Sequence, residues 1–132
     1  MAGPLSTQET STCDIREVLN LVADKWSLFV ISQLGEGPRR FSEIKRLVEG
    51  ISQRMLTVTL RRLERDGILT RTVYEVMPPH VAYDLTPLGM SLLRAAEPII
   101  AWSNGHLTHV AAARAKYDAS QRGQAADLGN VR

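Results

Sequence analysis

The stretch from Phe41 to Leu85 constrains the fold of this chain more than any other part. It begins with a short helical segment at 41–48, which a glycine ends. A second helical segment at 52–66 is apolar on one side and rich in arginine on the other. Gly67 follows it, and two β-rich runs then stand on either side of Pro78-Pro79. This order predicts a small, mainly helical domain with one antiparallel ribbon.

The second helical segment has two unlike faces. At about 100° per residue, three leucines fall on one face: Leu56, Leu60 and Leu63. The opposite face carries Arg54, Val58, Arg61, Arg62 and Arg65, with Thr57 at its border. Ser52 is placed to cap the first turn, and Gly67 stands where glycine often ends a helix. The pattern predicts a helix that is anchored on one side and cationic on the other.

Three other helices are predicted before it. Asp14 is placed to cap a first helix that runs to about Ala23, and a second helix is expected over 25–34. Ser42 is the predicted N-cap of the short third helix. The buried side of that third helix is formed by Ile44, Leu47 and Val48.

Two β-rich runs and a last helix complete the pattern. Residues 69–74 and 81–85 are predicted to pair as an antiparallel hairpin with a loop over 75–80. Thr86-Pro87 is a capping residue followed by proline at the first helical position, which predicts a helix start. Pro98 should kink that helix.

The predicted fold is therefore mainly α with a small antiparallel β-hairpin, a winged helix-turn-helix. We expect residues 1–12 to form a flexible arm, 13–115 to form the domain, and 116–132, which are small and polar, to be disordered. No apolar run approaches the roughly 20 residues that span a bilayer, and the N-terminus lacks the pattern of a signal peptide. We expect a cytoplasmic protein without a membrane partner.

Charge is unevenly distributed along the chain, although the net charge is only +2. The window from Pro38 to Thr72 has nine basic and four acidic residues, so it carries +5 and the rest of the chain carries −3. A basic middle between acidic flanks favours contact with a polyanion. A solvated mixed surface, the alternative interpretation, would not require this segregation.

The helix predicted over 53–66 fits the requirements for reading double-stranded DNA. The major groove is about 12 Å wide and admits one helix, in which arginine can pair with guanine and valine can contact a thymine methyl group. Helix-turn-helix proteins point the N-terminal residues of this helix toward base edges. The hairpin can act as a wing along phosphates or in the minor groove. The predicted DNA-binding residues are Arg39, Arg40, Ser42, Ser52, Gln53, Arg54, Thr57, Val58, Arg61, Arg62, Arg65, Arg71 and His80.

A set of short motifs runs through the chain from about Cys13 to His106. They are Cys13-Asp14, Asp24-Lys25-Trp26, Gly37-Pro38-Arg39-Arg40-Phe41-Ser42-Glu43-Ile44, Gly50-Ile51-Ser52-Gln53-Arg54-Met55-Leu56-Thr57, Leu60-Arg61-Arg62-Leu63-Glu64-Arg65-Asp66-Gly67, Pro78-Pro79, Val81, Tyr83, Leu85-Thr86-Pro87-Leu88-Gly89 and Trp102. In these motifs the chain resembles the HxlR-type transcriptional regulators, a winged-helix group related to the MarR proteins.

The resemblance implies a homodimer in which the first and last helices pack across a two-fold axis. It also implies a promoter operator that is an inverted repeat, with one half-site for each recognition helix. This chain departs from the family at His80, where the family commonly places arginine after the paired prolines. A neutral imidazole is a poorer contact for phosphate than a guanidinium group. Some relatives use a cysteine at the position of Cys13 as a thiol-based sensor.

Cys13 is the single cysteine, which excludes a disulfide within one chain and a multi-cysteine zinc site. It stands just before the first helix, where the helix dipole favours a thiolate, whereas Asp14 beside it opposes one. We hypothesise an oxidant effector that acts through Cys13. The alternative is a small buried residue without a redox role. An apolar pocket for a small-molecule effector between the dimer helices is a further hypothesis.

The sequence has no pattern for catalysis, a cofactor or a metal. Ser, His and Asp occur in no recognisable nucleophile–base arrangement, there is no glycine-rich phosphate loop, and His106 and His109 have no third ligand nearby in the sequence. Two other classes stay open. One is a winged helix whose basic face binds an acidic protein, and the other is a small-molecule binder or enzyme, which would need a convergent polar pocket.

Overall fold

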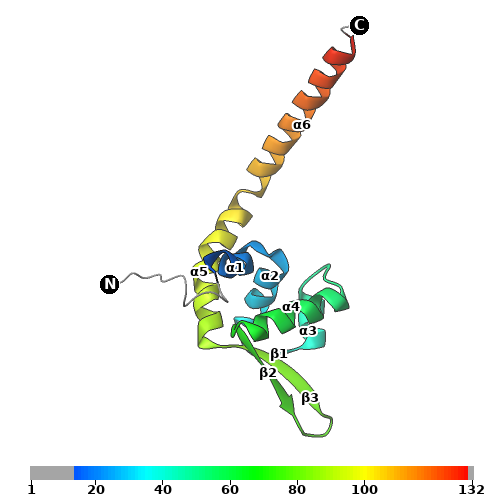
Figure 1. Ribbon diagram of the computed structural model, residues 1–132. Helices are drawn as coiled ribbons and strands as arrows, with labels where there is room; N and C mark the ends of the chain where they lie inside the picture. Colours follow the sequence, from blue (N-terminus) through cyan, green and yellow to red (C-terminus); the bar gives the residue numbers. More distant parts are fainter. Residues whose placement is uncertain (1–13, 131–132) are drawn as a thin grey trace, which may run out of the picture. The chain divides into compact units, whose positions relative to one another are not determined.

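A computed structural model describes residues 14–130, which form two compact units (Figure 1). The first unit ends at Ala96 and the second begins at Glu97. In chain order the elements are α1 (Ile15–Ala23), α2 (Lys25–Leu34), β1 (Arg39–Arg40), α3 (Phe41–Leu47), α4 (Gln53–Arg65), β2 (Leu69–Tyr74), β3 (His80–Leu85), α5 (Pro87–Gly105) and α6 (Leu107–Asn130). Within the described residues, no helix combines the length and the apolar character that crossing a membrane requires.

Helix α1 begins at the predicted cap, and Asp24, which was not predicted as a cap, joins it to α2. The carboxylate of Asp14 accepts a hydrogen bond from the backbone N–H of Arg16 at 2.9 Å. Asp24 is the one residue between α1 and α2. Its N–H donates to the carbonyl oxygen of Asn20 at 2.9 Å, and its side chain accepts from the N–H of Trp26 at 3.2 Å. Asp24 therefore ends α1 and begins α2.

The sheet has three antiparallel strands in the order β1-β3-β2. The predicted hairpin is present, with Leu69 opposite Leu85 and Tyr74 opposite His80, so β3 begins one residue earlier than expected. The strand β1 was not predicted. It pairs with the middle of β3, where Arg39 is opposite Tyr83. A strand of two residues has no periodicity of its own, so only its partner defines it.

The core of the first unit lies between the helices and the base of the hairpin. The three leucines predicted for the inner face of α4 are buried there, with exposed fractions of 0–2%. They pack in one cluster with the buried residues Val30, Ile31, Leu34, Ile44, Val48, Ile51, Ile68 and Leu69. Because a fully buried aliphatic side chain contributes roughly 1.5–3 kcal/mol, this face holds α4 firmly to the domain.

The prediction that Ser42 caps α3 is wrong. The helix begins at Phe41, directly after β1, and Arg40 occupies the N-cap position. The carboxylate of Glu43 accepts a hydrogen bond from the N–H of Arg40 at 3.0 Å. Reaching back from the N3 position in this way satisfies a free donor at the helix start without a hydroxyl group.

The last part of the chain is more helical than predicted. As expected, the hydroxyl of Thr86 accepts from the N–H of Gly89 at 3.0 Å and α5 starts at Pro87. Helix α5 continues through Pro98 to Gly105. Helix α6 extends to Asn130 and so enters the segment 116–132, for which disorder was expected. It has seven alanines, and alanine is the strongest helix former.

Candidate nucleic-acid interface

Helix α4 is held at its start by a local cap and a glycine turn. The hydroxyl of Ser52 accepts a hydrogen bond from the N–H of Met55 at 3.0 Å, which confirms its predicted role as N-cap. Gly50 has a φ of 89°, a left-handed conformation that suits glycine. The chain can therefore turn sharply from α3 into α4. Gly67, with a φ of 78°, ends the helix in the same conformation.

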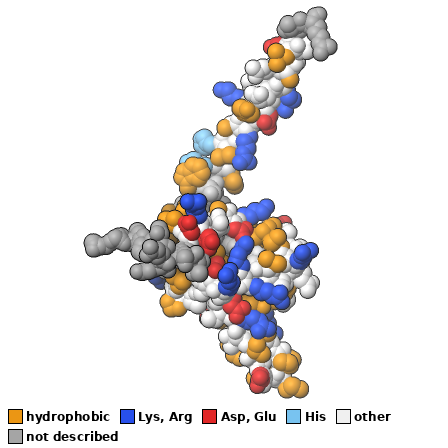
Figure 2. Space-filling model, viewed as in Figure 1, with side chains coloured by type: hydrophobic (Ala, Val, Ile, Leu, Met, Phe, Trp, Pro, Cys, Tyr) orange, Lys and Arg blue, Asp and Glu red, His pale blue; other side chains and the backbone are white. Residues whose placement is uncertain are grey.

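The outer face of α4 is uncovered. Gln53, Arg54, Arg61 and Arg65 are exposed, and Val58 is 47% exposed. Thr57 is half-buried and its hydroxyl donates to the carbonyl oxygen of Gln53 at 2.9 Å. Figure 2 shows Lys and Arg side chains gathered on the face that carries α4. The helix thus has the two unlike faces that its sequence predicts.

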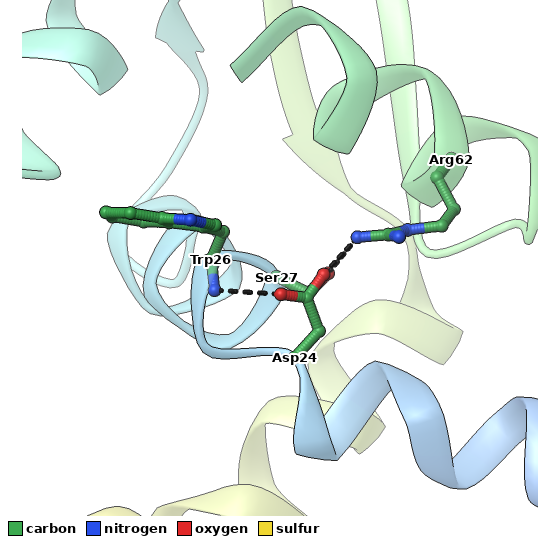
Figure 3. Close-up of polar contacts among 4 residues, drawn as sticks. All are labelled: Asp24, Trp26, Ser27 and Arg62. Atoms are coloured by element: carbon green, nitrogen blue, oxygen red, sulfur yellow. Dashed lines mark hydrogen bonds and ion pairs between the residues drawn. The ribbon is translucent and has the colours of Figure 1, made fainter. Parts of the chain in front are cut away.

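One predicted member of this face lies elsewhere. The guanidinium group of Arg62 forms an ion pair with Asp24 and points toward the start of α2 (Figure 3). It is the single ion pair within residues 14–130. Arg54, Arg61 and Arg65 therefore have no carboxylate partner in that part of the chain. We correct the predicted cationic face by leaving Arg62 out of it.

The arginines before α3 take different positions. Arg39 is half-buried, and its Nε donates to the carbonyl oxygen of Gln33 at 2.6 Å, so this side chain is tied to the end of α2. Arg40 is exposed in β1, and Ser42 is exposed in the first turn of α3. Of the two predicted arginine contacts, Arg40 thus has the more accessible charge.

A groove of about 550 Å³ separates the outer face of α4 from the sheet. Its lining residues are Phe41, Gln53, Thr57, Leu60, Arg61, Glu64, Arg71 and Tyr83. Four of these were predicted to bind DNA: Gln53, Thr57, Arg61 and Arg71. The sequence did not indicate that Phe41, Glu64 and Tyr83 line the groove. The groove depends on the pairing of β1 with β3, which has no signal in the local sequence.

The hairpin carries little positive charge beyond its base. Arg71 is opposite Tyr83 near the base, and His80 stacks on Tyr74 with ring centroids 4.8 Å apart. Between residues 72 and 80 the sequence has no lysine or arginine. The tip is apolar instead, and Met77 is 94% exposed.

Two other predicted features can be located only in part. Cys13 lies outside the described residues. Within them there is no group of three His, Cys, Asp or Glu side chains that could hold a metal ion. A mainly apolar cavity of about 750 Å³ lies inside one chain, and its wall comes from α1, the end of α4 and the start of α5. This cavity is not the effector pocket of the sequence analysis, which is expected between the helices of two copies.

Comparison with known proteins agrees with this architecture. The profile of the HxlR-like helix-turn-helix family matches residues 21–111. The uncharacterised HTH-type transcriptional regulator YtfH of Escherichia coli (strain K12) is 41% identical over 102 residues, which cover 77% of this chain and 81% of YtfH.

Solved structures show the same fold. The structure of ytfH from Salmonella typhimurium, described as a candidate transcriptional regulator, has a TM-score of 0.70 at 37% identity, covering 86% of this chain and 98% of that one. The redox regulator HypR in its oxidised form has a TM-score of 0.65 at 36% identity, covering 70% of this chain and 96% of HypR. The chain, with its winged helix and uncovered cationic helix, belongs to the HxlR-like helix-turn-helix family of transcriptional regulators.

Proposed function

We propose that this regulator binds double-stranded DNA with α4 in the major groove and the β2–β3 hairpin along the backbone. The observation that carries the proposal is the outer face of α4. Its guanidinium groups at Arg54 and Arg61 are exposed and have no carboxylate partner within residues 14–130, while the inner face is fixed in the core. Such a helix offers free donors to a groove without losing its anchor.

The exposed side chains divide into two proposed roles. Base contacts from Gln53, Arg54, Thr57, Val58 and Arg61 would supply selectivity. Phosphate contacts would supply most of the affinity and a steep salt dependence, since each one releases counterions from the duplex. The proposed phosphate contacts are Arg40, Ser42, Ser52, Arg65 and Arg71, with Arg39 and His80 at the margins.

The proposed DNA complex is a homodimer on an inverted repeat. Helix α1 supports this, because it presents apolar side chains to solvent: Ile15 is 72% exposed and Leu19 is 56% exposed. Exposed apolar faces of this kind mark interaction surfaces. A two-fold dimer would place two copies of α4 on half-sites about one helical turn apart.

Arg61 gives a direct test of base reading. We expect Arg61→Ala to weaken binding to the operator by about 1–3 kcal/mol and to relax the preference at one base pair of each half-site. Footprinting on the DNA upstream of the gene that encodes this chain would locate the operator. Fluorescence anisotropy with duplexes substituted at single base pairs would then measure the base preference. Arg94→Ala, which removes an exposed arginine from α5, is the matched control and should bind as the parent does. A parent protein that binds no duplex at any salt concentration would refute the proposal.

A second proposal concerns regulation by thiol oxidation at Cys13. The likeness to HypR, described as a redox regulator, supports it, and so does the position of Cys13 one residue before the cap of α1. We expect diamide to change the operator affinity of the parent and to leave Cys13→Ser unchanged. The same response in both proteins would show that Cys13 is not the sensor.

A further inference from the structure

Arg62 and Asp24 connect the recognition helix to the junction between α1 and α2. These residues lie 38 positions apart in the sequence. Figure 3 shows the Arg62 side chain reaching from α4 to the Asp24 carboxylate at the start of α2. No other ion pair within residues 14–130 links α4 to the rest of the domain.

The Asp24 carboxylate makes several bonds at once. One oxygen, Oδ1, accepts from the N–H of Trp26 at 3.2 Å and so caps α2. The other, Oδ2, accepts from the hydroxyl of Ser27 at 2.8 Å and from Nη2 of Arg62. The same Nη2 lies 3.1 Å from the Ser27 hydroxyl oxygen, to which it donates. Since Ser27 is fully buried, the Arg62 side chain, itself 43% exposed, is bonded to a residue of the core.

Arg62 stands at the border of the two faces of α4. Thr59, one turn before it, is fully buried, while Arg61 beside it belongs to the outer face. A bond from this border to α2 opposes rotation of α4 about its own axis. Rotation is the movement that would turn Arg54, Val58 and Arg61 away from the base edges. The apolar inner face resists it less specifically, because leucine contacts have no direction.

We propose that Asp24 and Arg62 are positioning residues that fix the rotation of α4 and thereby set how well the protein distinguishes its operator from other DNA. This inference rests on the proposed DNA binding. Base contacts require side chains in defined places, whereas phosphate contacts tolerate displacement and carry no sequence information. Loss of the pair therefore lowers operator affinity and leaves binding to random DNA nearly unchanged.

The opposing interpretation is that Arg62 leaves Asp24 and contacts a DNA phosphate. The two interpretations differ in the role of Asp24. If Arg62 contacts phosphate, removing the Asp24 charge frees Arg62 and strengthens binding to every duplex. If the pair positions α4, removing either charge weakens the operator complex to a similar degree.

The test is a double-mutant cycle with Asp24→Asn, Arg62→Ala and the double variant. Asparagine is as good an N-cap as aspartate, so Asp24→Asn keeps the cap on α2 and removes the charge. Affinities for the operator and for a random duplex of equal length are measured by anisotropy across a salt series. Arg65→Ala, which removes a proposed phosphate contact one turn further along the same helix, is the matched control.

We expect each single variant to lose about tenfold in operator affinity and the double variant to lose no more than either one, as coupled residues do. Random-duplex affinity should change less than twofold, with an unchanged salt slope. A general loss of folded protein would lower both affinities equally, so the ratio separates positioning from stability. Arg65→Ala should instead weaken both duplexes and reduce the salt slope by about one for each phosphate that the variant no longer neutralises.

Four results would overturn the inference. The first two are independent effects of the two single variants and unchanged operator affinity in both. The others are tighter binding of Asp24→Asn to every duplex and a loss in Arg62→Ala that matches that of Arg65→Ala on random DNA. Parent protein that binds no duplex would instead refute the proposed function. In that event, amide hydrogen exchange tests the remaining part of the inference, that the pair fixes α4. This part requires faster exchange at the C-terminal end of α4 in both single variants and unchanged exchange in α3, and equal exchange in parent and variants would overturn it.

Discussion

Thr59 and Arg62 are three residues apart on α4, and neither role follows from the helical pattern alone. The pattern places leucines inward and arginines outward, and burial confirms most of that prediction. It cannot tell which residue at the border of the faces meets a carboxylate from another element. That depends on Asp24, which is distant in the sequence. Local caps such as Ser52 and Asp14 could be predicted, because their partners lie within three residues.

The hydroxyl of Thr59 has no hydrogen-bond partner among the described residues although it is fully buried. An unpaired buried hydroxyl costs roughly 1–3 kcal/mol. We therefore expect Thr59→Val, which keeps the shape and removes the polar atom, to raise the free energy of unfolding by about 1 kcal/mol in urea titrations. Thr57→Val is the control, because it breaks an existing bond to Gln53 and should not stabilise the protein. A less stable Thr59→Val protein would contradict this account.

At the scale of elements, most helices and the hairpin were predictable, whereas strand β1 and the part of α6 beyond residue 115 were not. Helices α1, α2 and α4 have caps and apolar repeats inside their own segments. Strand β1 exists only through its pairing with β3. Over residues 107–129, α6 has no buried residue and hence no apolar stripe to detect. The groove beside α4 depends on that strand pairing, so its full lining could not be predicted either.

The proposed contact of the hairpin with the DNA backbone can be tested by adding positive charge to it. His80 begins β3 and stacks on Tyr74. An arginine can keep the stacking and add a permanent charge. We expect His80→Arg to tighten binding to all duplexes and to steepen the salt slope by about one for each wing that reaches a phosphate.

The matched control for this change is His109→Arg, which makes the same substitution in α6. It should leave the salt slope as it is in the parent. An unchanged slope in His80→Arg would mean that the hairpin does not approach the backbone of the duplex.

At the scale of the whole molecule, the proposed binding to an inverted repeat would depend on formation of the proposed dimer. The outward apolar side chains of α1 would be covered in the proposed dimer. We expect Leu19→Asp to weaken dimerisation by two orders of magnitude or more, since burying an unpaired carboxylate costs roughly 3–5 kcal/mol. Sedimentation velocity over a concentration series would measure this, and operator binding should weaken in parallel.

Met77→Asp provides the comparison, because it adds the same charge to an exposed apolar residue at the hairpin tip. This variant should sediment as the parent does. Equal sedimentation of Leu19→Asp and the parent would show that α1 is not part of the dimer interface.

The junction at Asp24 has a mechanical consequence. Asp24 is the single residue between α1 and α2, and its side chain also forms an ion pair with Arg62 of α4. Helix α1 extends from this junction over nine residues, Ile15–Ala23. A rotation of α1 about this junction would displace the carboxylate that Arg62 contacts. We therefore expect the orientations of α1 and α4 to depend on one another through this one side chain.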